Sequence, residues 1–488
     1  MGVTERPFKK FALYNKKNLQ MIKLIKKNLT YIPIILLTIL LIVGYLVNKK
    51  NSYSKKNEIA IFAKQLNIRN EQIAKIQKNL LKDGKNINSL INEKYINFNK
   101  IFENKKLDEF IGNHLTKDYQ KNKNLNQYLV TKYKTNDMLF NGNIGATATG
   151  YLDFFNNDQN LLMTTYDGVF AYSNIKNIEN FKKIKINLND FINYDKFYFD
   201  FQYGIKDIFI NKNVVYVSYI DEETKDCFDL KILSANININ FLNFENFFKT
   251  SKCVKVNNGH GFWPHQGAGG RIFLADQDHI LFTTGDFRNR PLAQNSQSDF
   301  GKIIKINLKS KKSKIVSIGH RNPQGLFYSK KFDFILSTEH GPKGGDEINL
   351  NHKPFDQIKN FGWPIASYGE HYHKNYSEKI IKEAPLNKNH KKFGFIEPIK
   401  YFDPSIGISE VKSINNEDNI FFIGAMGNEI KDMDLGLHLI ELDKNHEKII
   451  KHVFVPINER IRDIVVSKKK DIVILFLETT SSLLVFKK

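Results

Sequence analysis

One strand–turn–strand unit recurs six times between residues 151 and 476, and this repeat constrains the fold more than any other feature. Each copy has a short apolar strand, a polar turn and a second, more apolar strand. The copies occupy residues 151–165, 207–218, 271–284, 325–338, 410–424 and 463–476. Turns such as Asn156-Asn-Asp-Gln contain residues that tight hairpins prefer. The repeat predicts an all-β fold, a six-bladed β-propeller over residues 136–488, in preference to a two-sheet sandwich.

The N-terminus has a different composition. Residues 1–30 are rich in lysine, and an uncharged apolar run follows from Tyr31 to Val47, close to the roughly 17–25 residues that a helix needs to cross a bilayer. The sequence therefore predicts a basic cytoplasmic tail (1–30) and a transmembrane signal anchor (31–48). The positive-inside bias places the C-terminal domain in the periplasm, on a single pass through a bacterial inner membrane. A cleaved signal peptide is the alternative, although Asn48-Lys-Lys-Asn-Ser lacks the small residues of a cleavage site.

Residues 49–135 are predicted to form a short helical stalk or linker. Apolar residues from Ile59 to Leu80 recur at intervals of three and four, which places them on one helix face. A coiled coil is one interpretation. A helix packed against the propeller, or a spacer, is favoured because the heptads are few.

The formal net charge of +22 raises the question of nucleic-acid binding. The lysines are spread along the whole chain, whereas a phosphate-binding surface would cluster them on one face. We therefore expect no nucleic-acid partner. The two cysteines, Cys227 and Cys253, flank a predicted hairpin, and the sequence leaves open whether they form a disulfide or remain free thiols.

Glycines, prolines, charges and aromatic residues concentrate between residues 259 and 363, where a propeller presents a binding face. Three motifs stand out: Gly319-His-Arg-Asn-Pro-Gln-Gly-Leu, Glu339-His-Gly-Pro-Lys-Gly-Gly-Asp-Glu and Asn360-Phe-Gly-Trp-Pro. With Glu459-Arg-Ile-Arg-Asp near the C-terminus, they resemble the glucose/sorbosone dehydrogenase family, the soluble aldose dehydrogenases that use pyrroloquinoline quinone (PQQ). The resemblance covers about residues 140–488.

The resemblance implies roles for individual residues. His265 matches the catalytic base that removes the hydroxyl proton, and Asp286 matches the carboxylate that orients it. Arg321 and Asn322 match residues that contact the quinone, and we count Arg321 among the catalytic residues. Arg460 and Arg462 match the residues that hold the cofactor's carboxylates, for which a guanidinium is well suited.

The resemblance also implies two calcium sites, with oxygen ligands that calcium favours. The backbone carbonyls of Gly341 and Pro342 match the ligands of the calcium that clamps PQQ. Glu347, with the carbonyl of Phe361, resembles part of a second, structural site.

The chain departs from the family pattern in three places. Extra residues separate His265 from Arg271, Ala425-Met-Gly-Asn stands where a quinone-binding lysine is usual, and a stacking tryptophan is replaced near Phe402.

Two functions follow from these features. The first is a membrane-anchored, periplasm-facing oxidoreductase that oxidises a sugar hydroxyl by hydride transfer to PQQ and passes the electrons to a membrane quinone or a cytochrome. The alternative is a non-catalytic propeller with a degraded cofactor site that binds a glycan or a protein.

Overall fold

The structure is a computed structural model that describes residues 94–112, 125, 127–135, 149–192, 203–255, 267–372, 376–428 and 430–488. All of these residues belong to one compact unit, Asn86–Lys488. The expected tail, the expected anchor at 31–48, the start of the expected stalk and His265 lie outside the described residues. Within the ranges above, the structure contains no helix that is both long enough and apolar enough to cross a membrane.

Antiparallel sheets make up most of the described chain. The first three contain β3 (Gly150–Phe155), β4 (Asn160–Thr165), β5 (Phe170–Asn174) and β6 (Asn180–Lys183); β8 (Gly204–Asn211), β9 (Val214–Thr224), β10 (Cys227–Asn236), β12 (Glu245–Lys249) and β13 (Val254–Lys255); and β14 (Gly269–Asp276), β15 (His279–Thr284), β16 (Lys302–Asn307), β17 (Ser313–Ile318) and β21 (Lys359–Asn360).

The remaining sheets follow in chain order. They contain β18 (Pro323–Ser329), β19 (Phe334–Glu339), β20 (Asp346–His352) and β22 (Lys400–Phe402); β23 (Ile408–Ser413), β24 (Ile420–Ala425), β25 (Leu437–Leu442) and β26 (Ile449–Val455); and β27 (Ile461–Val466), β28 (Ile472–Leu477), β29 (Ser482–Lys487) and β2 (Leu129–Thr135). A small parallel pair joins β7 (Lys185–Ile186) to β11 (Phe241–Leu242). The helices are short: α5 (Leu107–Ile111), α9 (Glu378–Glu383), η3 (Leu188–Asp190), η5 (Arg290–Gln294), η6 (His390–Phe393) and η7 (Ile430–Asp432).

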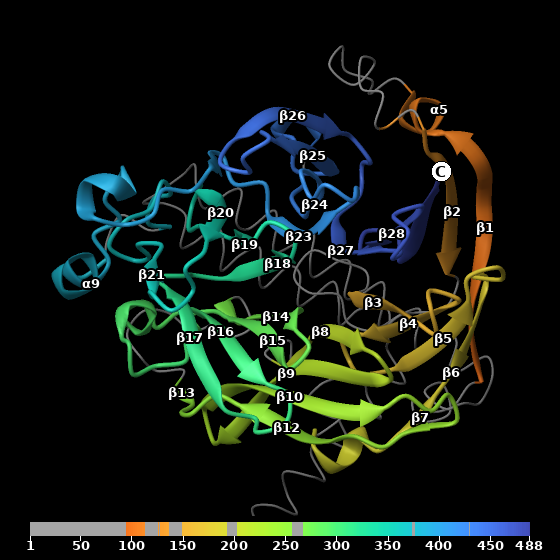
Figure 1. Ribbon diagram of the computed structural model, residues 1–488, viewed down its shortest axis with the longest axis horizontal. Helices are drawn as coiled ribbons and strands as arrows, with labels where there is room; N and C mark the ends of the chain where they lie inside the picture. Colours follow the sequence, from red (N-terminus) through yellow and green to blue (C-terminus); the bar gives the residue numbers. More distant parts are fainter. Residues whose placement is uncertain are drawn as a thin grey trace, which may run out of the picture. The chain divides into compact units, whose positions relative to one another are not determined.

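The first strand of each sheet lies nearest the centre (Figure 1). These inner strands pack on one another in a closed circuit, in the order β3, β8, β14, β18, β23, β27 and back to β3. This radial arrangement is that of a β-propeller, and it confirms the all-β prediction. We call the end at which the inner strands begin the site end of the ring.

The N-terminal segment closes the ring, which corrects the expected stalk. β1 (Tyr95–Lys106) and β2 are strands, not helix: β2 pairs with β29 of the last sheet, and β1 pairs with both β2 and β6 of the first. The local pattern explains the difference, because Ile96 and Phe98 are buried and their neighbours are exposed, a period of two. Pairing also covers the free edges of β29 and β6, which would otherwise expose unpaired backbone groups. The helical periodicity from Ile59 to Leu80 lies outside the described residues.

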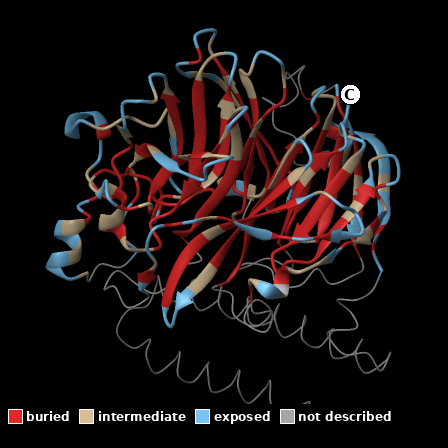
Figure 2. Cartoon of the chain, turned by 60° about the horizontal axis from the view of Figure 1, so that its bottom comes forward, coloured by how far each residue is buried: buried red, intermediate tan, exposed pale blue. Residues whose placement is uncertain are grey.

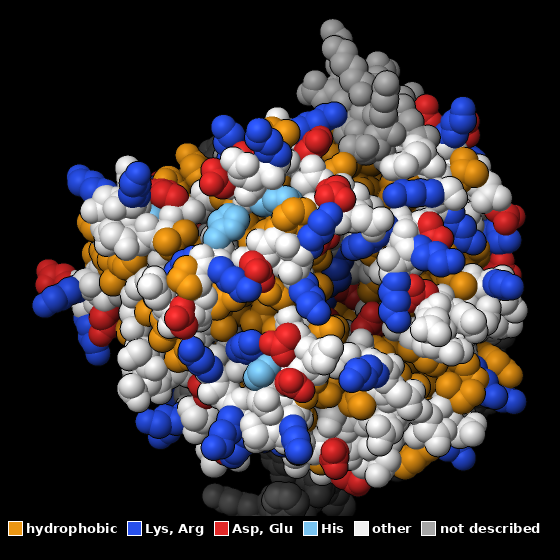
Figure 3. Space-filling view, in the orientation of Figure 1, with side chains coloured by type: hydrophobic (Ala, Val, Ile, Leu, Met, Phe, Trp, Pro, Cys, Tyr) orange, Lys and Arg blue, Asp and Glu red, His pale blue; other side chains and the backbone are white. Residues whose placement is uncertain are grey.

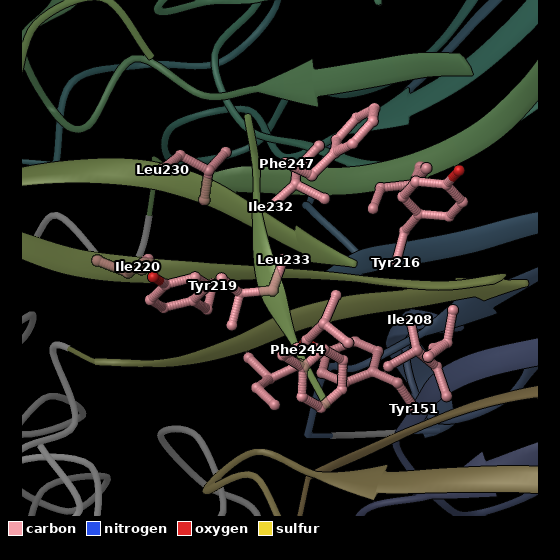
Figure 4. Packing of buried hydrophobic residues seen from close by; sticks show 14 of the residues in the cluster. Tyr151, Ile208, Tyr216, Tyr219, Ile220, Leu230, Ile232, Leu233, Phe244 and Phe247 are labelled. Carbon is pink, nitrogen blue, oxygen red and sulfur yellow. The ribbon is translucent and has the colours of Figure 1, made fainter. Parts of the chain in front are cut away.

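Apolar side chains pack into clusters between neighbouring sheets. Most strand residues are buried, and the exposed residues concentrate at turns and at the rim (Figure 2). The largest of these clusters joins the first three sheets, and Figure 4 shows some of its members from β3, β8, β9 and β10. Each fully buried Leu, Ile or Phe in such a core contributes about 1.5–3 kcal/mol. A disulfide between Cys227 and Cys253 joins the start of β10 to the segment before β13, which settles the pairing that the sequence left open.

A buried ion cluster lies on the axis of the ring. The Arg271 guanidinium contacts carboxylates from three other inner strands, at 3.0 Å from Asp207, 3.0 Å from Glu410 and 2.7 Å from Asp463. Burial opposes the charge, but these carboxylates raise the pKa of Arg271 above its ordinary value. The cluster therefore ties four sheets together.

The end opposite the site end is hollowed. A cavity of about 170 Å³ is lined by residues from all the inner strands, including the three carboxylates that bind Arg271. Figure 3 shows a hollow at the centre of the ring, bordered by acidic and basic side chains.

Candidate functional site

The predicted site residues that the structure describes lie at strand ends on the site end of the ring. Asp286 follows β15, Arg321 and Asn322 directly precede β18, the segment Gly341–Pro342 follows β19, and Arg460 and Arg462 flank the first residue of β27. The second strand of an antiparallel sheet ends where the first begins, so these segments share one end. The structure therefore brings residues together that lie up to 176 positions apart in sequence, from 286 to 462.

Arg460 and Arg462 converge on one buried carboxylate. Glu478, which follows β28, accepts from Nε of Arg462 at 2.5 Å and from Nε of Arg460 at 3.1 Å. Burial raises the pKa of Glu478, but Arg462 and Arg460 outweigh this effect and hold it below its ordinary value. Both arginines therefore face one side, and the single carboxylate of Glu478 leaves one of the two positive charges uncompensated within this cluster.

A polar chain links this pair to Asn322. Arg462 donates to Oε1 of Gln324 at 3.3 Å, and Gln324 donates to Oδ1 of Asn322 at 2.8 Å. Gln324 and Arg462 both lie at register shifts, in β18 and β27. A bulge of this kind re-aims a side chain, which explains how these polar groups leave the alternating pattern of their strands.

Arg321 and Asp286 meet around Trp363. The Trp363 indole donates to Oδ2 of Asp286 at 2.7 Å, and the Arg321 guanidinium lies over the same indole at 5.4 Å. The other Asp286 oxygen accepts from the backbone N–H of Arg288 at 2.8 Å. Burial raises the pKa of Asp286, and Arg321 counteracts the rise. Asp286 was expected to orient His265, whose position lies outside the described residues; the structure shows it bonded to Trp363 and Arg288.

The loop after β19 carries the carbonyls expected to bind calcium. Its backbone is fixed because Gly341 N–H donates to Asp346 at 2.9 Å, and Gly345 N–H donates to the carbonyl of Phe402 at 2.7 Å. Arg321 donates to the carbonyl of His340 at 2.9 Å, so this loop lies next to Arg321. Pro342 O lies 3.4 Å from the Ser405 hydroxyl. Backbone carbonyls held in this way are oxygen ligands of the kind that a hard cation such as calcium prefers.

The expected second calcium site contains an acid pair. Glu347 pairs across the sheet with Glu339, and the Asn349 amide donates to both carboxylates at 2.8 and 3.2 Å. Burial, and next the charge of Glu339, raise the pKa of Glu347 well above its ordinary value. Two buried carboxylates in contact favour a bound cation, which would let both ionise. Phe361 lies nearby, stacked on His320, whose Nδ1 is 3.6 Å from Glu339.

Sequence reasoning missed several members of this site. Glu478 gave no signal, and the motif that contains Gln324 gave no indication of its contacts, because both roles depend on strand register and on the bulges. Arg288 and Arg290 could have been found from composition: the chain has 73 lysines and arginines, but the sequence shows eight arginines, so each one is informative.

Comparisons with known proteins agree with this architecture. A family model described as Glucose / Sorbosone dehydrogenase matches residues 152–485. Aldose sugar dehydrogenase YliI of Escherichia coli (strain K12) is 29% identical over 230 residues, which are 43% of this chain and 55% of that protein. Quinoprotein glucose dehydrogenase B of Acinetobacter calcoaceticus is 29% identical over 155 residues, 24% of this chain and 31% of that protein. The matched regions thus span about half or less of these curated relatives.

A solved structure, described as a glucose dehydrogenase, superposes with a TM-score of 0.56 at 20% identity, over 73% of this chain and 99% of that one. The apo form of the E. coli soluble aldose sugar dehydrogenase gives 0.55 at 19% identity, with the same shares of both chains. These likenesses support the fold of the ring.

Proposed function

Since the chain belongs to the glucose/sorbosone dehydrogenase family, we propose that it is an oxidoreductase that oxidises a sugar hydroxyl with PQQ as its cofactor. The observation that carries the proposal is the convergence of Arg321, Arg460 and Arg462 at the site end. Such guanidiniums suit the carboxylates and the developing negative charge of a bound quinone. The quinoprotein among the relatives supports the choice of cofactor.

When bound, PQQ would supply the hydride acceptor, and the Gly341 and Pro342 carbonyls would hold the calcium that polarises it. The chain's own residues do the rest. Arg460 and Arg462 bind the cofactor's carboxylates, and Arg321 lies beside the loop that holds the cation. His265 is the residue that we expect to take the hydroxyl proton at an imidazole nitrogen.

The same proposal covers the larger organisation. The inner strands and their sheets form six blades, the last of which takes its outer strand, β2, from the N-terminal side. Residues 31–48 anchor the chain in the inner membrane with the ring in the periplasm, where electrons pass to a membrane quinone or a cytochrome. The Cys227–Cys253 disulfide supports an oxidising compartment.

The test is dye-linked turnover. We expect the purified full-length chain, loaded with PQQ and calcium, to reduce an electron-accepting dye with at least one of a panel of aldoses. His265→Ala should lower kcat by about a hundredfold or more, the usual contribution of a general base. If the chain binds the cofactor but oxidises no aldose of the panel, the proposed activity is refuted.

A second candidate function rests on Arg460. Its guanidinium donates to the carbonyls of Met426 and Gly427, in the segment that lacks the family lysine. Protein groups thus occupy donors that a cofactor would use, which favours a propeller that binds a glycan or a protein without catalysis. In that case PQQ should not quench the fluorescence of Trp263 or Trp363, and His265→Ala should leave ligand binding intact.

A further inference from the structure

Arginine is scarce in this chain and its placement is selective. Of the 73 basic residues eight are arginines, and the other 65 are lysines (73 − 8). The six arginines beyond residue 93 are Arg271, Arg288, Arg290, Arg321, Arg460 and Arg462. Arg271 lies in the axial cluster, and Arg321, Arg460 and Arg462 belong to the site. Arg288 and Arg290 lie beside Arg321, yet no role has been assigned to them above.

Arg288, Arg290 and Arg321 alternate with aromatic rings. Arg290 lies over Tyr376 at 5.3 Å and over Trp363 at 5.6 Å. Arg321 lies over Trp363 at 5.4 Å and over Tyr372 at 6.0 Å, and Arg288 continues the series over Tyr372 at 5.4 Å. Stacking holds the guanidinium faces in place, a use that lysine cannot match. Some donors at their edges already have protein partners, because Nη1 of Arg290 lies 3.0 Å from Nδ1 of His371 and Nη1 of Arg321 donates to the carbonyl of His340 at 2.9 Å. Each guanidinium carries five N–H donors, so one such bond does not exhaust it.

The charge of this ladder is unbalanced. Arg321 lowers the pKa of both Arg288 and Arg290, after the larger effect of burial, whereas Asp286 raises both. Asp286 directs its oxygens to Trp363 and to the backbone of Arg288. Among the described residues, the three guanidiniums therefore share the one carboxylate of Asp286, an excess of two positive charges (3 − 1) that an anionic ligand would offset.

The backbone also holds Arg288 in a strained conformation. Phe287 and Arg288 have φ of 50° and 63°, in the left-handed region that side chains other than glycine rarely adopt. Phe287 is buried against Phe300 at 4.9 Å, and Asp286 accepts the N–H of Arg288, so packing and capping impose the turn. Strain of this kind is maintained at sites that must present a side chain in one direction.

We propose that Arg288 and Arg290 form a subsite for an oxyanion, a carboxylate or a phosphate, carried by the sugar substrate. Planar oxyanions accept two parallel N–H bonds from a guanidinium. Arg321 belongs both to the ladder and to the cofactor site, so an anion bound here would place its sugar beside the reacting groups. Tyr372, which stacks on two of the arginines, is 41% exposed, so the ladder opens to solvent. That the ligand contains a sugar rests on the proposed function. That it carries an anion rests on the arginines alone.

The experiment compares anionic and neutral sugars by calorimetry. The full-length chain, with and without PQQ, is titrated with glucose, glucuronate, glucose 6-phosphate and inorganic phosphate. We expect at least one of the two anionic sugars to bind tenfold or more tightly than glucose. If glucuronate binds more tightly than glucose 6-phosphate, the subsite prefers a carboxylate. If glucose 6-phosphate binds more tightly, the subsite prefers a phosphate.

Variants assign the preference to the subsite. Arg288→Gln and Arg290→Gln should each reduce the ratio of anionic to neutral affinity by about tenfold to a hundredfold, the usual effect of losing a charged hydrogen bond. Arg288, being less buried than Arg290, gives the variant that is safer for folding. Lys331→Gln removes the same charge from an exposed turn and should keep the ratio.

Three results would overturn the subsite: equal affinity for glucose and both anionic sugars, a ratio that both arginine variants leave unchanged, or inorganic phosphate binding as tightly as glucose 6-phosphate. Arginine-dependent binding of an anionic sugar by a chain that takes up no PQQ would uphold the subsite and refute the dehydrogenase. Loss of PQQ binding in Arg288→Gln, without a change in the sugar ratio, would assign the ladder to the cofactor instead.

Discussion

At the scale of single residues, Arg271 joins four inner strands through one guanidinium. Its guanidinium contacts carboxylates from β8, β23 and β27, and its Nε and Nη2 donate to the carbonyls of Gln324 and Arg462. Removing one partner of a buried ion cluster leaves the others without compensation. Arg271→Met should therefore lower the free energy of unfolding by about 3–5 kcal/mol, measured by urea denaturation. The exposed Lys331→Met should change it by about 0.5 kcal/mol or less; a similar small effect at Arg271 would contradict the role.

Lys206, in β8, gives a prediction for pH dependence. Burial, followed by the charge of Arg462, lowers the pKa of Lys206 from 10.5 to about 7. Between these values the unfolded chain binds more protons than the native state, so the contribution of Lys206 makes stability fall as pH decreases from 10.5 to 7. Lys206→Met should flatten this part of the profile, as measured by urea midpoints at pH 7 and pH 9.5. If stability depends on pH to the same extent in Lys206→Met, the pKa of the Lys206 amine is not lowered in the folded chain.

At the scale of elements, β1 and β2 complete the ring from the N-terminal side. A chain that begins at residue 136 would expose the edges of β29 and β6 and lose the pairing of both strands. We expect it to aggregate or to unfold well below the melting temperature of the parent. A chain that begins at Asn86 keeps the whole compact unit and is the matched control. Equal stability of the two chains, by size-exclusion chromatography and thermal melting, would refute the closure.

The disulfide is a second element-scale device. Cys227 and Cys253 are 26 positions apart, and closing a loop of that length stabilises a fold by about 2–4 kcal/mol. Replacing both cysteines with serine should lower the free energy of unfolding by that amount. Reductant should lower the midpoint of urea denaturation of the parent chain and leave the midpoint of the double variant unchanged.

The positions of the strands were more predictable from the sequence than the pairing between them. The repeat located the first two strands of every sheet, because alternating apolar residues and turn residues are local signals. The expected stalk was wrong from Tyr95 onward, because β1 and β2 pair with strands that are distant in sequence. Pairing with the last sheet leaves no mark in residues 95–135 beyond a short period of two.

At the scale of the whole molecule, the sequence predicted which residues meet but not how they are held. Asp286, Arg321, Asn322, Arg460 and Arg462 share the site end, as the motifs implied. The contacts of Gln324 and Glu478 depend on bulges and register that no local pattern encodes, and the motif that contains Trp363 gave no indication of its bond to Asp286. The arginine–aromatic ladder was only partly covered by the motifs, which contain Arg321 and Trp363; the scarcity of arginine could have indicated Arg288 and Arg290.

The central claim is that the arginines and carbonyls of the site end bind PQQ with calcium. The most direct measurement is a calorimetric titration of the full-length chain with PQQ, with calcium present and with calcium chelated, repeated on Arg462→Gln and on Lys331→Gln. We predict saturable binding that calcium strengthens, that Arg462→Gln weakens by about tenfold or more, and that Lys331→Gln leaves unchanged. Absence of binding, or binding that is indifferent to both calcium and Arg462, would contradict the account.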